Sequence, residues 1–139
     1  MLVTNRETLK SKSVDYDAEE HELVEIVNIL EKELENSEVA GAGLSAIQIG
    51  IPVRIAIVRT SKCALTLYNA KILSASDCIN FEGEGCLSIP DTYVTTTRMN
   101  KIKVKNGNGA IHELEGFEAI VVQHELDHWD GILMTDRSI

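Results

Sequence analysis

A chain of 139 residues, 44% of them hydrophobic, is long enough for one domain with one core, and we expect that domain to span residues 1–139. The formal net charge of −9 argues against a nucleic-acid-binding surface, because such surfaces carry clusters of Lys and Arg. No stretch approaches the roughly 18 apolar residues of a membrane span, and residues 1–12 lack the apolar core of an export signal. The sequence therefore predicts a cytoplasmic protein with no membrane partner, whose three cysteines are free or bind a metal.

Residues 1–14 are expected to form an irregular lead-in, and the first helix is predicted to begin at Asp17. Asp17 is a suitable N-cap residue, and Glu20 stands three residues later, as in a capping box. Apolar residues then recur at helical spacing from Leu23 to Leu34, with Glu and Lys between them. This spacing predicts an amphipathic helix whose apolar side faces the core.

The middle of the chain is rich in β-branched residues and is expected to form strands. The predicted strands are Val53–Val58, Ala64–Tyr68, Tyr93–Thr97 and Ile102–Lys105. The run Asn106-Gly107-Asn108-Gly109 favours a hairpin turn after the last of them. A second helix is predicted from Gly116 to Asp130, where Gly131 would end it. A helix, several antiparallel strands and a second helix indicate an α+β fold.

Residues 124–128 match the pattern H-E-x-x-H. On a helix, His124 and His128 lie on one face one turn apart, so both imidazoles can bind one metal ion at about 2.1 Å. Glu125 is rotated from His124 by roughly 100° and can act as a general base at the open position of the metal. The apolar run 119–122 indicates that the helix is buried, and buried histidines need partners. The pattern therefore predicts a metal site with Glu125 as the catalytic acid/base.

A third metal ligand is expected upstream, because the 11 residues after His128 contain no His, Glu or Cys. The best candidate is Cys86, since Gly83 and Gly85 let the backbone come close to a ligand. One thiolate and two imidazoles leave the fourth position of a tetrahedral site open for water. Two alternatives remain: Cys86 is an ordinary buried residue, or Cys78 also binds and makes the metal structural.

Residues 41–46 fit the loose dinucleotide-binding pattern G-x-G-x-x-A, but we reject that function. The pattern must follow a strand and open a helix, whereas here it follows a helix and precedes a strand. We interpret the segment as a loop whose backbone pairs with an extended peptide. Gln48 lies just beyond it, and its side-chain amide is either a donor to a developing oxyanion or an ordinary polar group at a strand start.

Three motifs in this order resemble those of the peptide deformylase family. Residues 41–48 are similar to G-x-G-L-A-A-x-Q, residues 84–88 to E-G-C-L-S, and residues 123–128 to Q-H-E-x-D-H. Ser45 stands where the family usually has Ala, and because both side chains are small we expect little change. The sequence ends at Ile139 without the C-terminal helix of many bacterial members, and in this respect it is similar to compact members such as those encoded by bacteriophages.

The resemblance implies antiparallel sheets packed around a central C-terminal helix that carries H-E-x-x-H, with an N-terminal helix beside them. It implies hydrolysis of the formyl group on the initiator methionine of nascent polypeptides, with release of formate. In this scheme Cys86, His124 and His128 hold the metal and Glu125 is the acid/base, while Gln48 and the backbone N–H of Leu87 stabilise the oxyanion. The residues implied to bind the peptide are Ala42, Gly43 and Gly85 for its backbone, and Phe117, Ile120 and Val121, with Arg98 nearby, for the methionine side chain.

One thiolate and two imidazoles suit Zn²⁺, Fe²⁺, Co²⁺ or Ni²⁺, and the resemblance implies Fe²⁺ as the native ion. The expected partners are the N-formyl-Met peptides of nascent chains, and the resemblance also implies the ribosome. We expect a monomer in the cytoplasm of a bacterial or phage-infected cell. The main alternative is an H-E-x-x-H metallopeptidase that cleaves internal peptide bonds, although the expected downstream ligand is lacking. A second alternative is a non-catalytic peptide-binding module with a structural metal.

Overall fold

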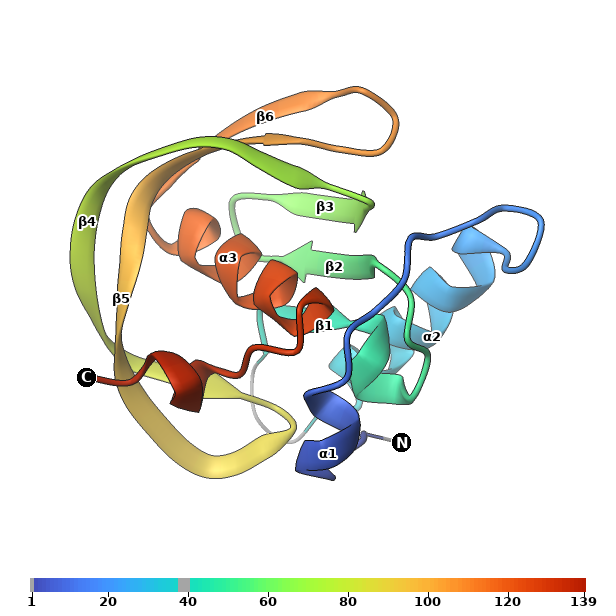
Figure 1. Ribbon diagram of the computed structural model, residues 1–139, viewed down its shortest axis with the longest axis horizontal. Coiled ribbons are helices and arrows are strands. Elements are labelled where there is room, and N and C mark those ends of the chain that lie inside the picture. Colours follow the sequence, from blue (N-terminus) through green and yellow to red (C-terminus); the bar gives the residue numbers. More distant parts are fainter. Residues whose placement is uncertain (1, 38–40) are drawn as a thin grey trace.

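The computed structural model describes residues 2–37 and 41–139, and most of them belong to two three-stranded antiparallel sheets (Figure 1). Helix α3 (Phe117–Trp129) contacts β1 and β2 of the first sheet and β5 and β6 of the second. The α+β prediction and the central position of this helix are therefore confirmed. Among the described residues, no helix combines the length and the apolar character needed to cross a bilayer.

The first sheet consists of β1 (Gly43–Ser45), β2 (Ile55–Arg59) and β3 (Ala64–Tyr68), in that order. The predicted third strand matches β3, and β2 begins two residues later than expected. The segment that was expected to be a loop contains β1, which pairs with β2 in the register Gly43↔Val58. Three residues that include a glycine are too few to show the alternation that marks a strand.

The second sheet consists of β4 (Lys71–Cys86), β5 (Ile89–Lys105) and β6 (Ile111–Glu115), in that order. Long, curved β4 and β5 wrap around one side of α3 (Figure 1). The two short strands predicted between residues 93 and 105 are one continuous strand, β5, and β4 was not predicted at all. The first eight residues of β4 are exposed, so its sequence carries no alternation of buried and solvated positions. The hairpin turn at residues 106–109 is confirmed, because β5 and β6 pair on either side of it.

The helices differ from the predictions at the N-terminal end. A short helix, α1 (Arg6–Leu9), lies in the expected irregular lead-in, and the side chain of Asn5 caps it by accepting hydrogen bonds from two backbone N–H groups. Helix α2 (Leu23–Glu35) begins six residues after Asp17, whose carboxylate instead accepts a hydrogen bond from the backbone N–H of Glu19 in a turn. Helix α3 ends at Trp129, one residue before the predicted end, and Gly131 follows its C-cap residue Asp130 at φ 74°, as expected of a terminating glycine.

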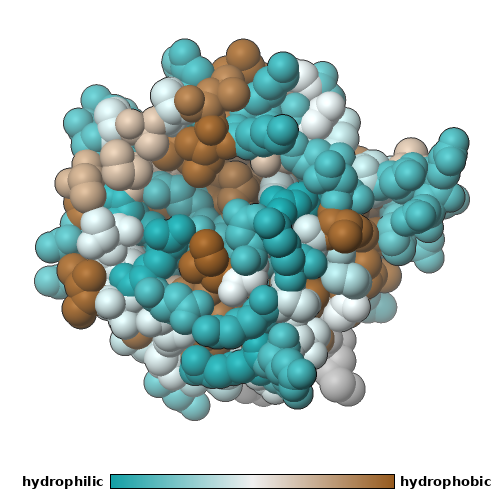
Figure 2. Space-filling model, viewed as in Figure 1, coloured by the Kyte–Doolittle hydropathy of each residue, from teal (hydrophilic) through white to brown (hydrophobic). Residues whose placement is uncertain are grey.

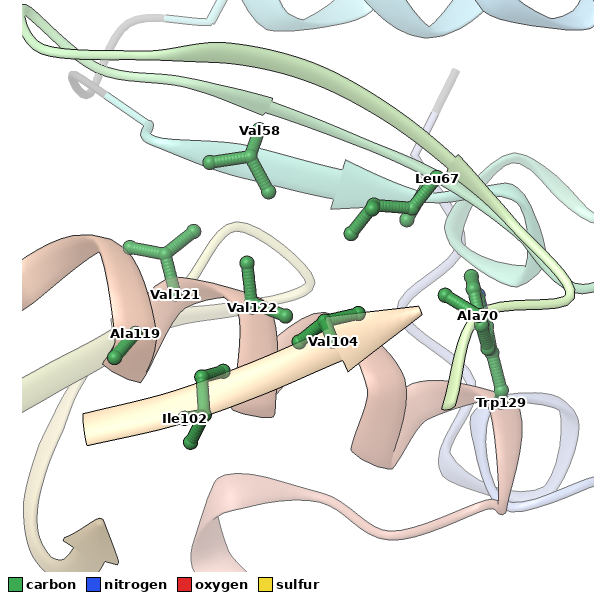
Figure 3. Close-up of a cluster of buried hydrophobic side chains, with 10 residues drawn as sticks. Val58, Leu67, Ala70, Ile102, Val104, Ala119, Val121, Val122 and Trp129 are labelled. Carbon is green, nitrogen blue, oxygen red and sulfur yellow. The ribbon is translucent and has the colours of Figure 1, made fainter. Parts of the chain in front are cut away.

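The largest buried cluster joins α3 to both sheets. Figure 3 shows Val58 and Leu67 of the first sheet facing Val121 and Val122 of α3, with Ile102 and Val104 of β5 next to the same helix. Full burial of side chains of this kind stabilises the fold by about 1.5–3 kcal/mol each. The outer surface on the side seen in Figure 1 is mainly hydrophilic, with hydrophobic residues in small groups (Figure 2). Helix α3 is thus held firmly between two layers, and the H-E-x-x-H side chains start from a fixed backbone.

Candidate metal centre and active site

The end of β4 meets α3 at the three predicted metal ligands. The candidate ligand atoms of Cys86, His124 and His128 all lie within 4.8 Å of one another, and Sγ of Cys86 is 3.5 Å from Nε2 of His128. Within the described part of the chain, this is the one cluster of such residues, and the exposed Cys78 does not belong to it. One thiolate and two imidazoles fit a divalent transition-metal ion and leave a tetrahedral position free.

His124 is oriented by a buried carboxylate. Its Nδ1 donates a hydrogen bond of 2.8 Å to Glu84, so its Nε2 is left for a metal. Glu84 also accepts bonds of 2.9 Å and 2.6 Å from Arg98 and one of 2.7 Å from Thr96. Burial raises the pKa of Glu84, but the bonds from His124 and Arg98 outweigh it and hold the pKa well below its usual range. Glu84 is therefore a permanent anion that fixes the imidazole.

The ionic contacts continue from Arg98 toward the C-terminal turn η2 (Met134–Arg137). Arg98 donates a bond of 2.6 Å to Asp127, and Asp127 also accepts bonds of 2.5 Å and 2.9 Å from Arg137. Arg98 lies behind Glu84 and does not line the cavity described below, although it was expected near the methionine pocket. A buried guanidinium needs compensating carboxylates, and Arg98 finds them in Glu84 and Asp127, on the side of Glu84 that faces away from the cavity.

His128 has a different environment. Its Nδ1 is buried and has no hydrogen-bond partner among the described residues. Burial lowers the pKa of His128 to about 3, with the charge of Arg98 acting in the same direction, so the ring is neutral, as a metal ligand must be. The neighbouring Cys86 packs against a buried apolar cluster that consists of Leu9, Ile89, Leu133 and Met134.

Glu125 is 3% exposed, and it follows the first of the two ligands on α3. Burial raises the pKa of Glu125 to about 7, although a hydrogen bond from Ser45 and the charge of Arg98 act in the opposite direction. A β-carbon added to Gly43 would lie 2.7 Å from Oε2 of Glu125, so only a glycine lets strand β1 pass this close to the carboxylate. A carboxyl group with a pKa near neutrality can both accept and return a proton.

Gln48 lies on the short turn η1 (Ala46–Ile49), and its side chain is buried and oriented. Its Oε1 accepts a hydrogen bond of 2.9 Å from the backbone N–H of Ser45. The amide nitrogen therefore points to the other side, where it lies 3.1 Å from Oγ of Ser88 and 3.6 Å from Sγ of Cys86. The amide of Gln48 thus lies beside a candidate metal ligand, and its role as an oxyanion donor stays a prediction.

A cavity of about 270 Å³ opens beside the metal ligands. Its lining includes the predicted residues Ala42, Gly43, Gln48, Gly85, Cys86, Leu87, Phe117, Ile120, Val121, His124 and Glu125. Phe81, Ile89 and Tyr93 also line it and were missed by the sequence analysis. Their place could have been found only from the pairing of β4 with β5, and β4 left no pattern in the sequence.

A family model described as polypeptide deformylase matches residues 1–139. The chain belongs to the polypeptide deformylase family. The peptide deformylase of Helicobacter hepaticus is 32% identical over 93% of this chain and 77% of its own length. That of Aquifex aeolicus is 38% identical over 81% of this chain and 78% of its own. A crystal structure of class I type b peptide deformylase from Acinetobacter baumannii superposes with a TM-score of 0.86 at 31% identity, covering 98% of this chain and 97% of that one.

The three motifs of the deformylase family come from separate elements and meet around one cavity. The first runs through β1 and η1, the second spans the end of β4 and the bend that follows it, and the third lies on α3. Each contributes a different chemical group: the first a side-chain amide, the second a thiol, and the third two imidazoles and a carboxylate. The site is thus assembled where the two antiparallel sheets pack on α3.

Proposed function

We propose that this chain is a metal-dependent peptide deformylase, which removes the N-formyl group from the initiator methionine of nascent polypeptides and releases formate. The observation that carries the proposal is the convergence of Cys86, His124 and His128 beside the buried carboxylate of Glu125. Membership of the deformylase family favours this activity over an internal peptidase. The exposed position of Cys78 argues against a closed structural site.

In this mechanism the metal is held by Cys86, His124 and His128, and when bound it supplies Lewis-acid chemistry that acidifies water. Glu125 accepts the proton of the attacking water molecule and later donates it to the leaving amine. The oxyanion that forms at the formyl carbon accepts hydrogen bonds from the side chain of Gln48 and the backbone N–H of Leu87. Removal of one donor of this kind costs roughly 10²–10³ in rate.

The substrate side of the cavity is apolar, as a methionine side chain requires. Ile120 and Val121 are buried on α3, and Phe117 is 48% exposed at the start of the helix. The ring of Phe117 lies 6.3 Å from that of Phe81 on β4, so the two aromatic residues bridge the helix and the sheet. We propose that these side chains hold the methionine, while the backbone at Ala42, Gly43 and Gly85 pairs with the extended peptide.

The proposed native ion is Fe²⁺, although the same ligands suit Zn²⁺, Ni²⁺ or Co²⁺. Metal analysis after anaerobic purification tests this choice, and stoichiometric zinc with no iron would overturn it. We further propose a cytoplasmic monomer that meets its substrates at the ribosome. Sedimentation of the protein alone and with ribosomes tests both statements.

The decisive experiment measures formate release from formyl-Met-Ala by protein loaded with Fe²⁺ or Ni²⁺ under anaerobic conditions. Glu125→Gln keeps the shape of the side chain but cannot accept a proton, so turnover should fall at least about 10²-fold while the metal remains bound. Glu118→Gln, a similar change in the first turn of α3, serves as the control and should retain activity. Full activity of Glu125→Gln would refute the proposed role, and cleavage of unformylated peptides alone would favour the metallopeptidase.

A further inference from the structure

Ser45 lies between Glu125 and Gln48 and contacts both of them. Its side chain is fully buried at the end of β1. Its hydroxyl oxygen is 3.1 Å from Oε1 of Glu125 and 3.0 Å from the backbone oxygen of the same residue. Its backbone N–H donates a hydrogen bond of 2.9 Å to Gln48. One residue therefore contacts both the proposed acid/base and the proposed oxyanion donor.

The two contacts of Ser45 depend on different parts of the residue. Any amino acid other than proline would supply the N–H that orients Gln48. Only a hydroxyl side chain of this size can reach the carboxylate of Glu125. Among the described residues, the hydroxyl of Ser45 is the one hydrogen-bond donor recorded for that carboxylate. Replacement of Ser45 by alanine would therefore remove the restraint on Glu125 and leave the restraint on Gln48 in place.

The carboxylate of Glu125 is held from two directions. Oε1 faces the hydroxyl of Ser45, and Oε2 lies only 2.7 Å from the point that a β-carbon of residue 43 would occupy. A glutamate side chain has three rotatable bonds, and a group that transfers protons must be kept within about 0.5 Å of its productive position. Close packing against Gly43 limits movement toward β1, whereas the hydrogen bond from Ser45 selects one orientation of the carboxylate.

We propose that Ser45 is a positioning residue for the acid/base Glu125. The hydroxyl holds the carboxylate in the orientation in which it receives and returns the proton of the reaction. This role rests on the deformylase activity proposed above. It also differs from the sequence-based expectation that serine in place of alanine would change little.

The test compares Ser45→Ala with a matched control, Ser13→Ala. Both serines are buried, but the hydroxyl of Ser13 has no hydrogen-bond partner among the described residues. For Ser45→Ala we expect kcat on formyl-Met-Ala to fall roughly 3- to 10-fold, the range that one ordinary hydrogen bond represents. KM and the content of bound metal should not change, because Ser45 binds neither substrate nor metal. Ser13→Ala should keep the kcat of the wild type.

Three outcomes would overturn the proposal. An unchanged kcat with a lowered melting temperature in Ser45→Ala would show that the hydroxyl serves only the backbone oxygen of Glu125. A loss of bound metal in Ser45→Ala would show that the hydroxyl supports the metal site instead of Glu125. An equal loss of kcat in Ser13→Ala would show that removal of any buried serine hydroxyl lowers the activity. If the wild type releases no formate, the deformylase assignment itself fails. The crystal structure of Ser45→Ala then still decides, because an unmoved Glu125 carboxylate would contradict positioning by the hydroxyl.

Discussion

The two sides of the metal centre are supported by different kinds of interaction. The charged side, behind His124, consists of Glu84, Arg98, Asp127 and Arg137, which are joined by ionic hydrogen bonds of 2.5–2.9 Å. The apolar side, behind Cys86, consists of Leu9, Ile89, Leu133 and Met134. Hydrogen bonds fix which ring nitrogen carries a proton and how the ring is turned, whereas packing fixes position alone. His124 is therefore oriented by charge, whereas Cys86 is placed by close packing.

The largest effect is expected from breaking the charged side with Glu84→Ala. This change leaves the buried guanidinium of Arg98 and the Nδ1 of His124 without their carboxylate partner. The free energy of unfolding of the metal-free protein should fall by about 3–5 kcal/mol, the usual cost of a buried charge that loses its partner. Metal affinity should fall about 10- to 100-fold, because the first ligand is no longer oriented.

Urea unfolding and competition with a chelator measure the two effects of Glu84→Ala. Glu84→Gln is the matched control, since it keeps the shape and can still accept a hydrogen bond from His124. Its losses should be smaller than those of the alanine variant. Equal stability of Glu84→Ala and wild type would remove the distinction between the two sides.

A smaller effect on the metal is expected from the apolar side, which Leu133→Ala tests. Leu133 is fully buried, so its truncation should cost about 2–5 kcal/mol of unfolding free energy through lost burial and a residual cavity. The bond between His124 and Glu84 is untouched, and metal affinity should fall less than in Glu84→Ala. Leu73→Ala, at a leucine that is 50% exposed, should change stability by less than about 0.5 kcal/mol. A larger loss of metal affinity in Leu133→Ala than in Glu84→Ala would reverse the comparison.

The smallest effect is expected at Asp136, which accepts a hydrogen bond from the backbone of Leu133 on the apolar side. A hydrogen bond of 2.9 Å from the backbone N–H of Leu133 lowers the pKa of Asp136, and a salt bridge of 3.0 Å with Lys10 adds to it. Because the folded pKa lies below the unfolded one, the carboxylate stabilises the protein above its unfolded pKa, and this contribution is lost as the pH falls through the folded pKa. Asp136→Asn should therefore cost up to about 1 kcal/mol at neutral pH and less in acid. Melting curves over a range of pH test the sign, and a difference that grows in acid would contradict it.

The chemistry of the site was easier to predict from the sequence than the sheet that frames it. His124 and His128 stand four residues apart on one helix, so their spacing alone predicted their shared face, with Glu125 rotated to the side of it. Cys86 was found by excluding other ligands, and the structure places its sulfur beside both rings. A pattern within one helix can be recognised in the sequence because the helix alone fixes the relative positions of its side chains.

The remaining features depend on contacts between distant segments, which no local pattern encodes. Strand β4 is largely exposed and follows its register with β5 through several irregularities, so it carries no period of two. The chain from His124 through Glu84 to Arg98 joins residues 14 to 40 positions apart. For the same reason, Arg98 was expected beside the substrate pocket, and the contact from Ser45 to Glu125 was not foreseen.

Gly43 shows how closely the backbone and the reactive group share space. Any β-carbon at this position would lie within 2.7 Å of the Glu125 carboxylate and 2.9 Å of the backbone oxygen of Ile57. The oxygen of Ile57 is backbone of β2, which pairs with β1, so it cannot move aside without disturbing the sheet. Any side chain introduced at residue 43 would therefore displace the carboxylate of Glu125 and impair the proposed acid/base. The path of β1 past the site is therefore compatible with glycine alone at residue 43.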